Sequence, residues 1–290
     1  MAKEVRNLGA SIRARLLTLS KASAQPFDVL LTRFVLERLL YRLSQSAHAP
    51  SFVLKGAMLL ATWAPNPHRG TRDLDLLGFG SSEGDAVLAI FREVLAAPHA
   101  DGVAFDIKAL RVDRIRDELE YGGVRLRTRA TIGGAQIPVV IDIGYGDATE
   151  PGLEELDYPV LLDFPAPHIR AYARETVIAE KFQAMVMLGR ANSRMKDFHD
   201  IWVLSRSYEF EGDRLARAIS ATFARRKTDI PDTPPDALGP DFAGDPAKQQ
   251  QWRAFVADVV SDPGSLQTVC ADLEGFLMPH ALHARSLQRP

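Results

Sequence analysis

The sequence predicts an α+β protein, with a sheet flanked by helices in the N-terminal half and helices alone in the C-terminal half. Three observations lead to this fold class. Apolar and acidic residues alternate over residues 73–77, which is typical of a strand with one buried face. Residues 124–143 alternate on both sides of Gly133-Gly134, a pattern typical of a β-hairpin. From residue 175 onward, apolar residues recur every three or four positions, which indicates helices.

The length of 290 residues is sufficient for two domains. The composition shifts to Pro, Glu and Asp over residues 151–167, which is typical of a boundary region. We therefore predict that residues 1–150 form a first domain with the sheet, and that residues 151–290 form a helical C-terminal domain.

The composition is that of an ordinary soluble globular protein, with 46% hydrophobic and 25% charged residues. The single cysteine, Cys270, excludes an intramolecular disulfide and a cysteine-based zinc site, and it favours a reducing compartment. No segment approaches the ~18 consecutive apolar residues of a membrane span, and the N-terminus has no apolar signal core, so we expect a cytoplasmic location. A net charge of −2 argues against non-specific coating of nucleic acid but leaves a local basic patch open.

Each element of the first domain follows from its local pattern. Pro26 suits the first position of a helix, and Gly133-Gly134 suits a two-residue hairpin turn. Periodicity predicts helices at 12–23, 26–44, 58–63 and 85–96, a loop at 65–72, and strands at 73–77, 105–109, 124–132 and 136–143.

Helical spacing continues through the second domain. A polar, proline-rich loop interrupts it at residues 228–245, and the tail after residue 277 is expected to be loose. The predicted helices are 175–188, 195–208, 214–226, 246–260 and 266–277.

Asp73 and Asp75 share one face of the predicted strand because side chains alternate with period two. Two neighbouring carboxylates repel each other, and a hard divalent cation such as Mg²⁺ between them relieves the repulsion. The Gly56-Ala57 step before the next helix has no bulky side chain, so its backbone N–H groups can approach a phosphate closely. Together these residues predict a site for a metal and a phosphorylated ligand.

A two-residue turn at Gly133-Gly134 sets the register of the hairpin, in which directly opposed residues share a face. One face is apolar and is expected to line the core. The other carries Asp142, a third candidate metal ligand, beside three arginines that would suit a phosphate backbone. A solvated sheet face is the alternative explanation for the arginines. They are Arg125, opposite Asp142, then Arg127, opposite Val140, and Arg129, opposite Pro138.

Charged residues also stand out in the C-terminal half. Lys181 on its first helix and Arg190 after the end of that helix could bind the triphosphate of a nucleotide. The alternative is a pair of exposed cations that complement the helix dipole. On the next helix, Lys196 lies four residues and Asp197 three residues before Asp200, so the three can lie close on one face. This favours a functional role for Lys196 and Asp200 over an ordinary intrahelical salt bridge.

The arrangement apolar–Gly–small–helix–loop–Asp–apolar–Asp over residues 52–78 resembles the first motif of the DNA polymerase beta superfamily of nucleotidyltransferases. More narrowly, the chain is similar, from about residue 53 to about residue 208, to the AbiEii family of type IV toxins associated with abortive infection. Ala57 stands where many relatives have Ser or Gly, so a hydroxyl donor to a triphosphate would be missing and the backbone donor would remain. The similarity lies in Arg69-Gly-Thr71-Arg-Asp73-Leu-Asp75-Leu, Glu180-Lys181 and Lys196-Asp197-Phe-His-Asp200.

The resemblance implies a mixed sheet and a nucleotidyltransferase with two Mg²⁺ ions and an NTP substrate. Relatives act on the 3′ end of tRNA and block translation, and a winged-helix antitoxin neutralises them. The metal ligands would be Asp73, Asp75 and Asp142, with Lys196 and Asp200 as further catalytic residues. The expected nucleotide-binding residues are Gly56, Ala57, Arg69, Thr71, Lys181 and Arg190, and the expected RNA-binding residues are Arg125, Arg127 and Arg129.

Three other functions fit parts of the pattern. A small-molecule nucleotidyltransferase that modifies antibiotics would share the fold and the acids. A phosphatase of the haloacid dehalogenase type also has Asp-x-Asp after an apolar strand, but the second position after the pair is usually Thr or Val there and is Leu77 here. A non-catalytic module that only binds a partner protein would not need all three acids.

Overall fold

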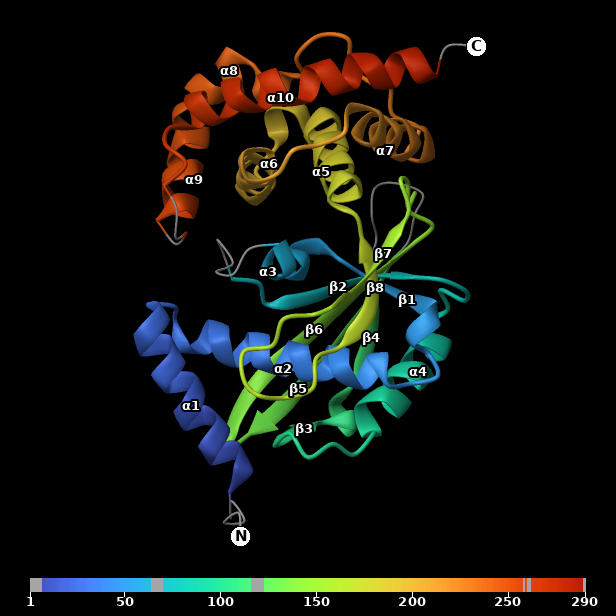
Figure 1. Ribbon diagram of the computed structural model, residues 1–290, viewed down its shortest axis with the longest axis vertical. Helices are drawn as coiled ribbons and strands as arrows, with labels where there is room; N and C mark the ends of the chain where they lie inside the picture. Colours follow the sequence, from blue (N-terminus) through green and yellow to red (C-terminus); the bar gives the residue numbers. More distant parts are fainter. Residues whose placement is uncertain (1–6, 64–69, 116–122, 258, 260–261, 289–290) are drawn as a thin grey trace. The chain divides into compact units, whose positions relative to one another are not determined.

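The computed structural model describes residues 7–63, 70–115, 123–257, 259 and 262–288, and Figure 1 shows its helices and strands. The chain divides into two compact units. The sheet unit comprises Met1–Gly146 and Glu155–Ala171, and the helical unit comprises Asp147–Glu154 and Tyr172–Pro290. The predicted division into domains at residue 150 stays a prediction. None of the described helices is long and apolar enough to cross a membrane.

A mixed sheet of eight strands confirms the predicted α+β fold class. The strand order is β3-β5-β6-β2-β1-β8-β7, and β4 pairs with β5 outside this path. The pairs β1–β2 and β5–β6 are antiparallel, whereas β2–β6 and β1–β8 are parallel. The strands are β1 (Phe52–Lys55), β2 (Asp73–Gly78), β3 (Val103–Phe105), β4 (Arg111–Ile115), β5 (Gly123–Ile132), β6 (Ala135–Tyr145), β7 (Leu153–Asp157) and β8 (His168–Tyr172).

The β5–β6 hairpin has the predicted register. Its turn is Gly133-Gly134, both with positive φ, as the tight turn requires. Arg125 lies opposite Asp142, so these two side chains leave the sheet on the same face. The opposite face lines the core through Val124, Leu126, Ile141 and Ile143, which are all buried.

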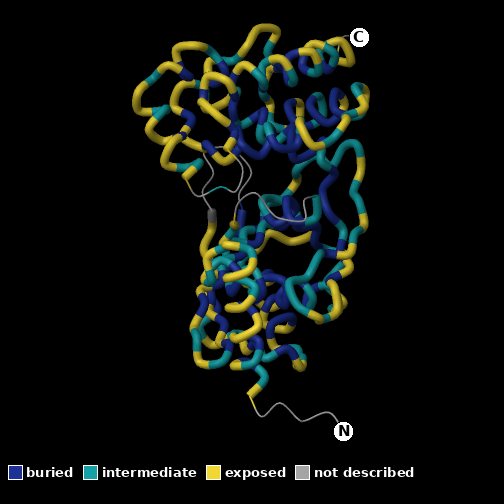
Figure 2. Tube along the Cα trace, turned by 60° about the vertical axis from the view of Figure 1, so that its left-hand side comes forward, coloured by how far each residue is buried: buried dark blue, intermediate teal, exposed yellow. Residues whose placement is uncertain are grey.

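Helices cover the apolar face of the sheet. Figure 1 shows α2 lying across β5 and β6, and its apolar side chains, such as Phe34 and Leu39, are fully buried. Figure 2 shows that buried segments concentrate inside each unit. The helices of the sheet unit are α1 (Leu8–Ser23), α2 (Phe27–Ser44), α3 (Leu60–Trp63) and α4 (Gly84–Ala96).

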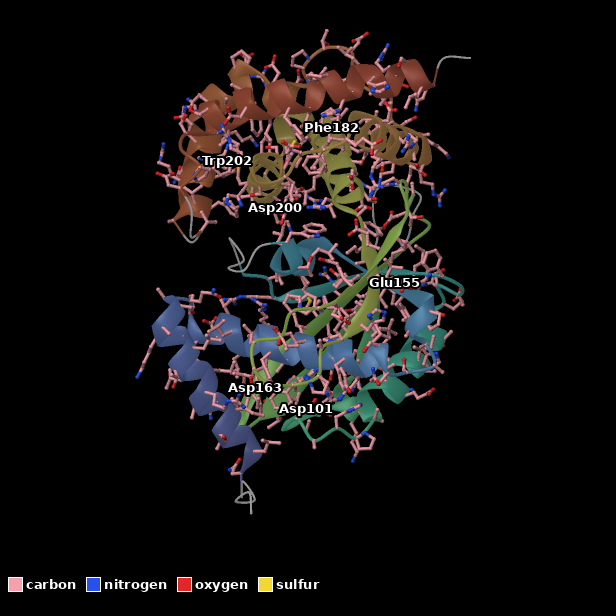
Figure 3. The ribbon with its side chains drawn as sticks, in the orientation of Figure 1. Asp101, Glu155, Asp163, Phe182, Asp200 and Trp202 are labelled. Carbon is pink, nitrogen blue, oxygen red and sulfur yellow. The ribbon has the colours of Figure 1, made fainter. Side chains whose placement is uncertain are left out.

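Buried polar side chains of α2 anchor two loops to this helix. Arg42 donates to both carboxylate oxygens of Asp101, at 2.6 and 3.0 Å. Glu37 accepts from the backbone N–H of Leu161 at 3.1 Å, and Arg38 donates to the carbonyl of Pro165 at 2.8 Å. Figure 3 labels Asp101 and, on the second of these loops, Asp163.

The helical unit is built around α5, α7 and α10. Phe182 and Phe223 lie with ring centroids 5.4 Å apart, and both are fully buried. The helices are α5 (Arg174–Leu188), α6 (Met195–Ser207), α7 (Gly212–Arg225), α8 (Pro240–Gly244), α9 (Pro246–Val256) and α10 (Leu266–Leu287).

Two sequence predictions about secondary structure were wrong, and the strand β7 was not predicted. Residues 106–109 leave the sheet after β3, because the Asp106 side chain accepts from the N–H of Ala109 and caps a 3-10 turn there. The expected boundary region contains β7, whose Leu-Glu-Glu-Leu-Asp sequence has low strand propensity and depends on its neighbour in the sheet. Helix α10 continues ten residues past the predicted end, through Pro279, because Ala281 and Ala284 are buried.

Candidate active site

Three carboxylates meet on the face of the sheet opposite its apolar core. Asp73 and Asp75 point the same way from β2, and the parallel pairing of β2 with β6 sets Asp142 directly beside Asp75. One oxygen from each of the three lies within 4.8 Å of the others, and all three residues are half-buried. The predicted convergence of these acids is therefore present in the structure. Carboxylate oxygens at such spacing are a donor set that suits a hard divalent cation.

Gly56 allows the chain to pass close to Asp75. It follows β1 at the strand-to-helix turn that the sequence predicts, with a φ of +72°. A Cβ atom on residue 56 would lie 2.6 Å from Cγ of Asp75 and nearer still to Oδ2, so no side chain fits there. The register also sets Lys55 opposite Asp75 on the same face, a basic neighbour that sequence reasoning did not single out.

Thr71 supports the first of the acids. Its hydroxyl donates to Oδ1 of Asp73 at 2.7 Å. This contact restrains the Asp73 carboxylate at one of its oxygens, in addition to any contact that Thr71 makes with a nucleotide. Ala57 and Thr71 also line a small pocket, together with Met58 and, from α2, Arg33. Arg69, another expected nucleotide ligand, lies outside the described residues.

The three arginines of β5 have different partners. Arg125 donates from Nε and Nη2 to the two oxygens of Asp142, at 2.6 and 2.5 Å. This hydrogen-bonded pair raises the pKa of Arg125 above its usual value, against the opposing effect of burial. Arg127 pairs with Asp113 of β4, with both side chains about half exposed. Arg129 is exposed on the same face.

A second charged cluster lies inside the helical unit. Lys181 on α5 binds Asp197 at 2.7 Å and Asp200 at 2.9 Å, both on α6, and Arg194 binds the other oxygen of Asp197 at 2.6 Å. Both aspartates are fully buried, and the Lys181 side chain is 11% exposed. Burial alone would raise the pKa of Asp197, but the charges of Lys181 and Arg194 outweigh it and hold the pKa below its usual value. Figure 3 labels Asp200 on α6.

Sequence reasoning named Lys181 and Asp200 separately and missed their pairing. It expected Asp200 beside Lys196, four residues earlier, but the structure pairs Asp200 with Lys181 and leaves Lys196 exposed. It treated Asp197 only as a neighbour, although that residue joins two cations. The signal was its three-residue spacing from Asp200, which puts both carboxylates on one face of α6. Arg190 is an exposed residue paired with Asp241 at 3.4 Å.

Glu180, which precedes Lys181 in the similar motif, has another set of partners. Its carboxylate binds Arg226 at 2.9 Å, and Arg226 also donates to Gln183 at 2.9 Å. Tyr172 donates to Asp147, which lies 3.6 Å from the same guanidinium. The two neighbouring charges of the motif therefore serve two different networks within the helical unit.

Comparison with known proteins agrees with this arrangement. Residues 38–276 match the family described as "Nucleotidyl transferase AbiEii toxin, Type IV TA system". The fold resembles that of JHP933 from Helicobacter pylori, with a TM-score of 0.52 and 16% identity over 91% of this chain and 96% of that one. It also resembles a candidate nucleotidyltransferase from H. pylori, with a TM-score of 0.50 and 17% identity over 90% and 98% of the two chains. Among curated proteins, none matches this sequence.

The mixed sheet, the triad of acids and the family match define an enzyme of the nucleotidyltransferase class. The structural neighbours, at under 25% identity, support the fold alone. The family match spans well over half of the chain. The protein belongs to the AbiEii family of nucleotidyltransferase toxins of type IV toxin–antitoxin systems.

Proposed function

We propose that this protein transfers a nucleotide from an NTP to a hydroxyl group of RNA, at the 3′ end of tRNA, and thereby inhibits translation. The observation that carries the proposal is the convergence of Asp73, Asp75 and Asp142 on one face of the sheet unit. Three half-buried carboxylates this close repel one another, and a nucleotidyltransferase of this family has a use for the cation that would relieve the repulsion.

The three acids fit Mg²⁺ because they offer only hard oxygen donors at compatible spacing. Two such ions, when bound, would stabilise the charge on the attacking and leaving oxygens of the transfer. The protein's own contribution is orientation. Thr71 holds Asp73, the missing side chain of Gly56 leaves room for Asp75, and Arg125 holds Asp142.

For the nucleotide, we propose that the turn formed by Gly56 and Ala57 donates backbone N–H groups to phosphate oxygens. A small pocket beside Ala57 and Thr71, lined by apolar and polar side chains and by Arg33, adjoins this turn. Further proposed nucleotide ligands are Arg69, Lys181 and Arg190. Lys196 and Asp200 remain proposed catalytic residues.

For the RNA, we propose the exposed face of β5 and β4. Alternate residues of a strand lie about 7 Å apart, so Arg125, Arg127 and Arg129 form a regular row. Arg127 is level with Asp73 in the register, and Arg129 extends the row beyond the acids. Arg111 of β4 is the register partner of Arg127 and adds another guanidinium to this row. An exposed ion pair such as Arg127–Asp113 contributes little to stability, so a phosphate can replace the aspartate at small cost.

Membership of a type IV toxin family implies an antitoxin. We propose, from the same resemblance, that it is a winged-helix protein and that the toxin acts in the cytoplasm.

Incubating the protein with Mg²⁺, each labelled NTP in turn, and either total tRNA or an aminoglycoside tests the proposal. We expect label on tRNA with one NTP or a few, none on the aminoglycoside, and reduced translation when the labelled tRNA supplies a cell-free extract. Label on the aminoglycoside alone would instead support the antibiotic-modifying alternative.

A further inference from the structure

We propose that Arg125 is a positioning residue for Asp142: its guanidinium fixes the orientation of that carboxylate and offsets one of the three negative charges of the triad when no divalent cation is bound. The inference rests on the proposed metal-dependent transfer, and it assigns Arg125 a role different from contact with RNA.

The geometry is that of a two-point clamp. Nε of Arg125 lies 2.6 Å from Oδ1 of Asp142, and Nη2 lies 2.5 Å from Oδ2. The two residues are direct register partners on β5 and β6, so the planar guanidinium meets the planar carboxylate across one step of the ladder. Two parallel hydrogen bonds fix the rotation of the carboxylate, which a single bond would leave free.

The clamp leaves Asp142 able to bind a cation. A carboxylate has about four lone-pair sites, and the guanidinium uses two of them. One oxygen of Asp142 still lies within 4.8 Å of oxygens from Asp73 and Asp75. Arg125 therefore orients the third acid towards the other two without blocking it.

The negative charge of the triad explains why a cation is needed beside Asp142. Three carboxylates within 4.8 Å repel one another in a half-buried site. The Arg125 side chain is 37% exposed and that of Asp142 18%, so water screens this pair less than an exposed one. Arg127, two residues further along β5, pairs instead with Asp113 outside the triad. Arg125 therefore differs from Arg127 because its partner is an acid of the triad.

Charge and orientation can be separated by two substitutions. Arg125→Lys keeps the positive charge but replaces the fork with a single point of contact. Arg125→Gln removes the charge. Arg114→Gln is the matched control, because Arg114 is an exposed residue of β4 that pairs with Glu83 at 3.3 Å, and its register partner Val124 is on the face of the sheet opposite the triad.

The first measurement is thermal stability with and without Mg²⁺, in the absence of nucleotide. Without metal, Arg125→Gln should melt below the wild type, whereas Arg125→Lys should melt close to it. Adding Mg²⁺ should raise the melting temperature of Arg125→Gln by more than that of the wild type, because the ion then relieves more repulsion. Arg114→Gln should show the wild-type gain. An equal gain in Arg125→Gln and the wild type would overturn the charge role, whether or not the protein transfers nucleotides.

The second measurement is the rate of transfer at saturating Mg²⁺. Both Arg125 variants should lose roughly tenfold or more in kcat, with little change in KM for the NTP, since a misplaced ligand affects the transition state. Compared with Arg125→Gln, Arg125→Lys should therefore regain the melting temperature of the wild type but not its kcat. Wild-type kcat in both variants, or a raised KM for RNA alone, would show that Arg125 does not position Asp142. If Arg125→Gln does not fold, the kcat of Arg125→Lys alone tests whether Arg125 positions Asp142, and a wild-type kcat would overturn that role.

Discussion

Gly56 and Asp75 lie so close that a methyl group on residue 56 would overlap the Asp75 carboxylate. Gly56→Ala should therefore displace the carboxylate and also strain the backbone, whose φ is +72°. We expect a loss of transfer activity of roughly a hundredfold, since small displacements at reacting centres have effects of this size. Steady-state kinetics on the folded variant measure it.

Gly80→Ala is the control for the backbone strain that Gly56→Ala introduces. Its φ is +99°, but a Cβ atom there meets nothing within 4 Å. Gly80→Ala should cost about 1 kcal/mol of stability and leave the transfer rate unchanged. Equal losses of activity in the two variants would mean that strain, and not the contact with Asp75, is responsible.

Lys181 bridges two fully buried carboxylates, so its removal should destabilise the helical unit. Lys181→Ala leaves Asp200 without its 2.9 Å partner and should lower the free energy of unfolding by about 3 kcal/mol or more. Lys196→Ala removes an exposed lysine from α6 and should change stability by no more than about 0.5 kcal/mol. Urea unfolding of both variants distinguishes a buried structural charge from a surface charge.

Neutralising Asp200 should partly restore stability to the Lys181 variant. Asp200→Asn combined with Lys181→Ala removes the buried charge that Lys181 no longer offsets, so the double variant should be more stable than the sum of the two single changes predicts. Simple additivity would contradict the coupling between the two residues.

Stability should also depend on pH through Glu37. Burial raises the pKa of this carboxyl to about 7, although Arg33 and the N–H of Leu161 oppose the shift. Between the ordinary value of 4.5 and about 7, the folded protein holds a proton that the unfolded chain releases. The contribution is complete below pH 4.5 and is lost as the pH rises through 7, up to about 3 kcal/mol.

Glu37→Gln isolates this effect because glutamine does not titrate. Denaturant titrations from pH 5 to 8 should show a decline in the free energy of unfolding for the wild type and a smaller decline for the variant. Parallel curves would show that Glu37 stays ionised across this range.

Arg129 offers a test of the RNA-binding face. It is exposed, and it follows Arg127 in the row along β5. Arg129→Gln should weaken binding to single-stranded RNA and reduce the slope of log K against log salt by about 0.7. Nucleotide affinity should not change. Fluorescence anisotropy at several salt concentrations measures the RNA affinity and its salt slope. An unchanged slope would show that Arg129 does not contact the RNA.

Local pattern was sufficient to predict most of the site in the sheet unit. Alternation set Asp73 and Asp75 on one face, and the two-glycine turn set the hairpin register that brings Arg125 opposite Asp142. The sequence did not reveal the partner strand of β6. The parallel pairing of β2 with β6, which joins Asp142 to the other acids, depends on contacts between segments some seventy residues apart.

The helical unit was harder to predict for a related reason. Helical periodicity identifies the faces of α5 and α6 but not which faces meet, so Lys181 and Asp200 were recognised separately and Asp197 was passed over. Burial by distant residues also extended α10 past Pro279, where local propensity predicts an end.

The central claim is that the triad of acids performs nucleotide transfer. Its most direct test compares the transfer of label from an NTP to tRNA by the wild type, by Asp75→Asn and by Asp163→Asn. Asp163 is an exposed acid of the same unit that pairs with Arg15, and its loss removes one negative charge without touching the triad. We predict Mg²⁺-dependent labelling by the wild type and by Asp163→Asn, and none by a folded Asp75→Asn. Equal labelling by all three proteins would contradict the assignment of the active site.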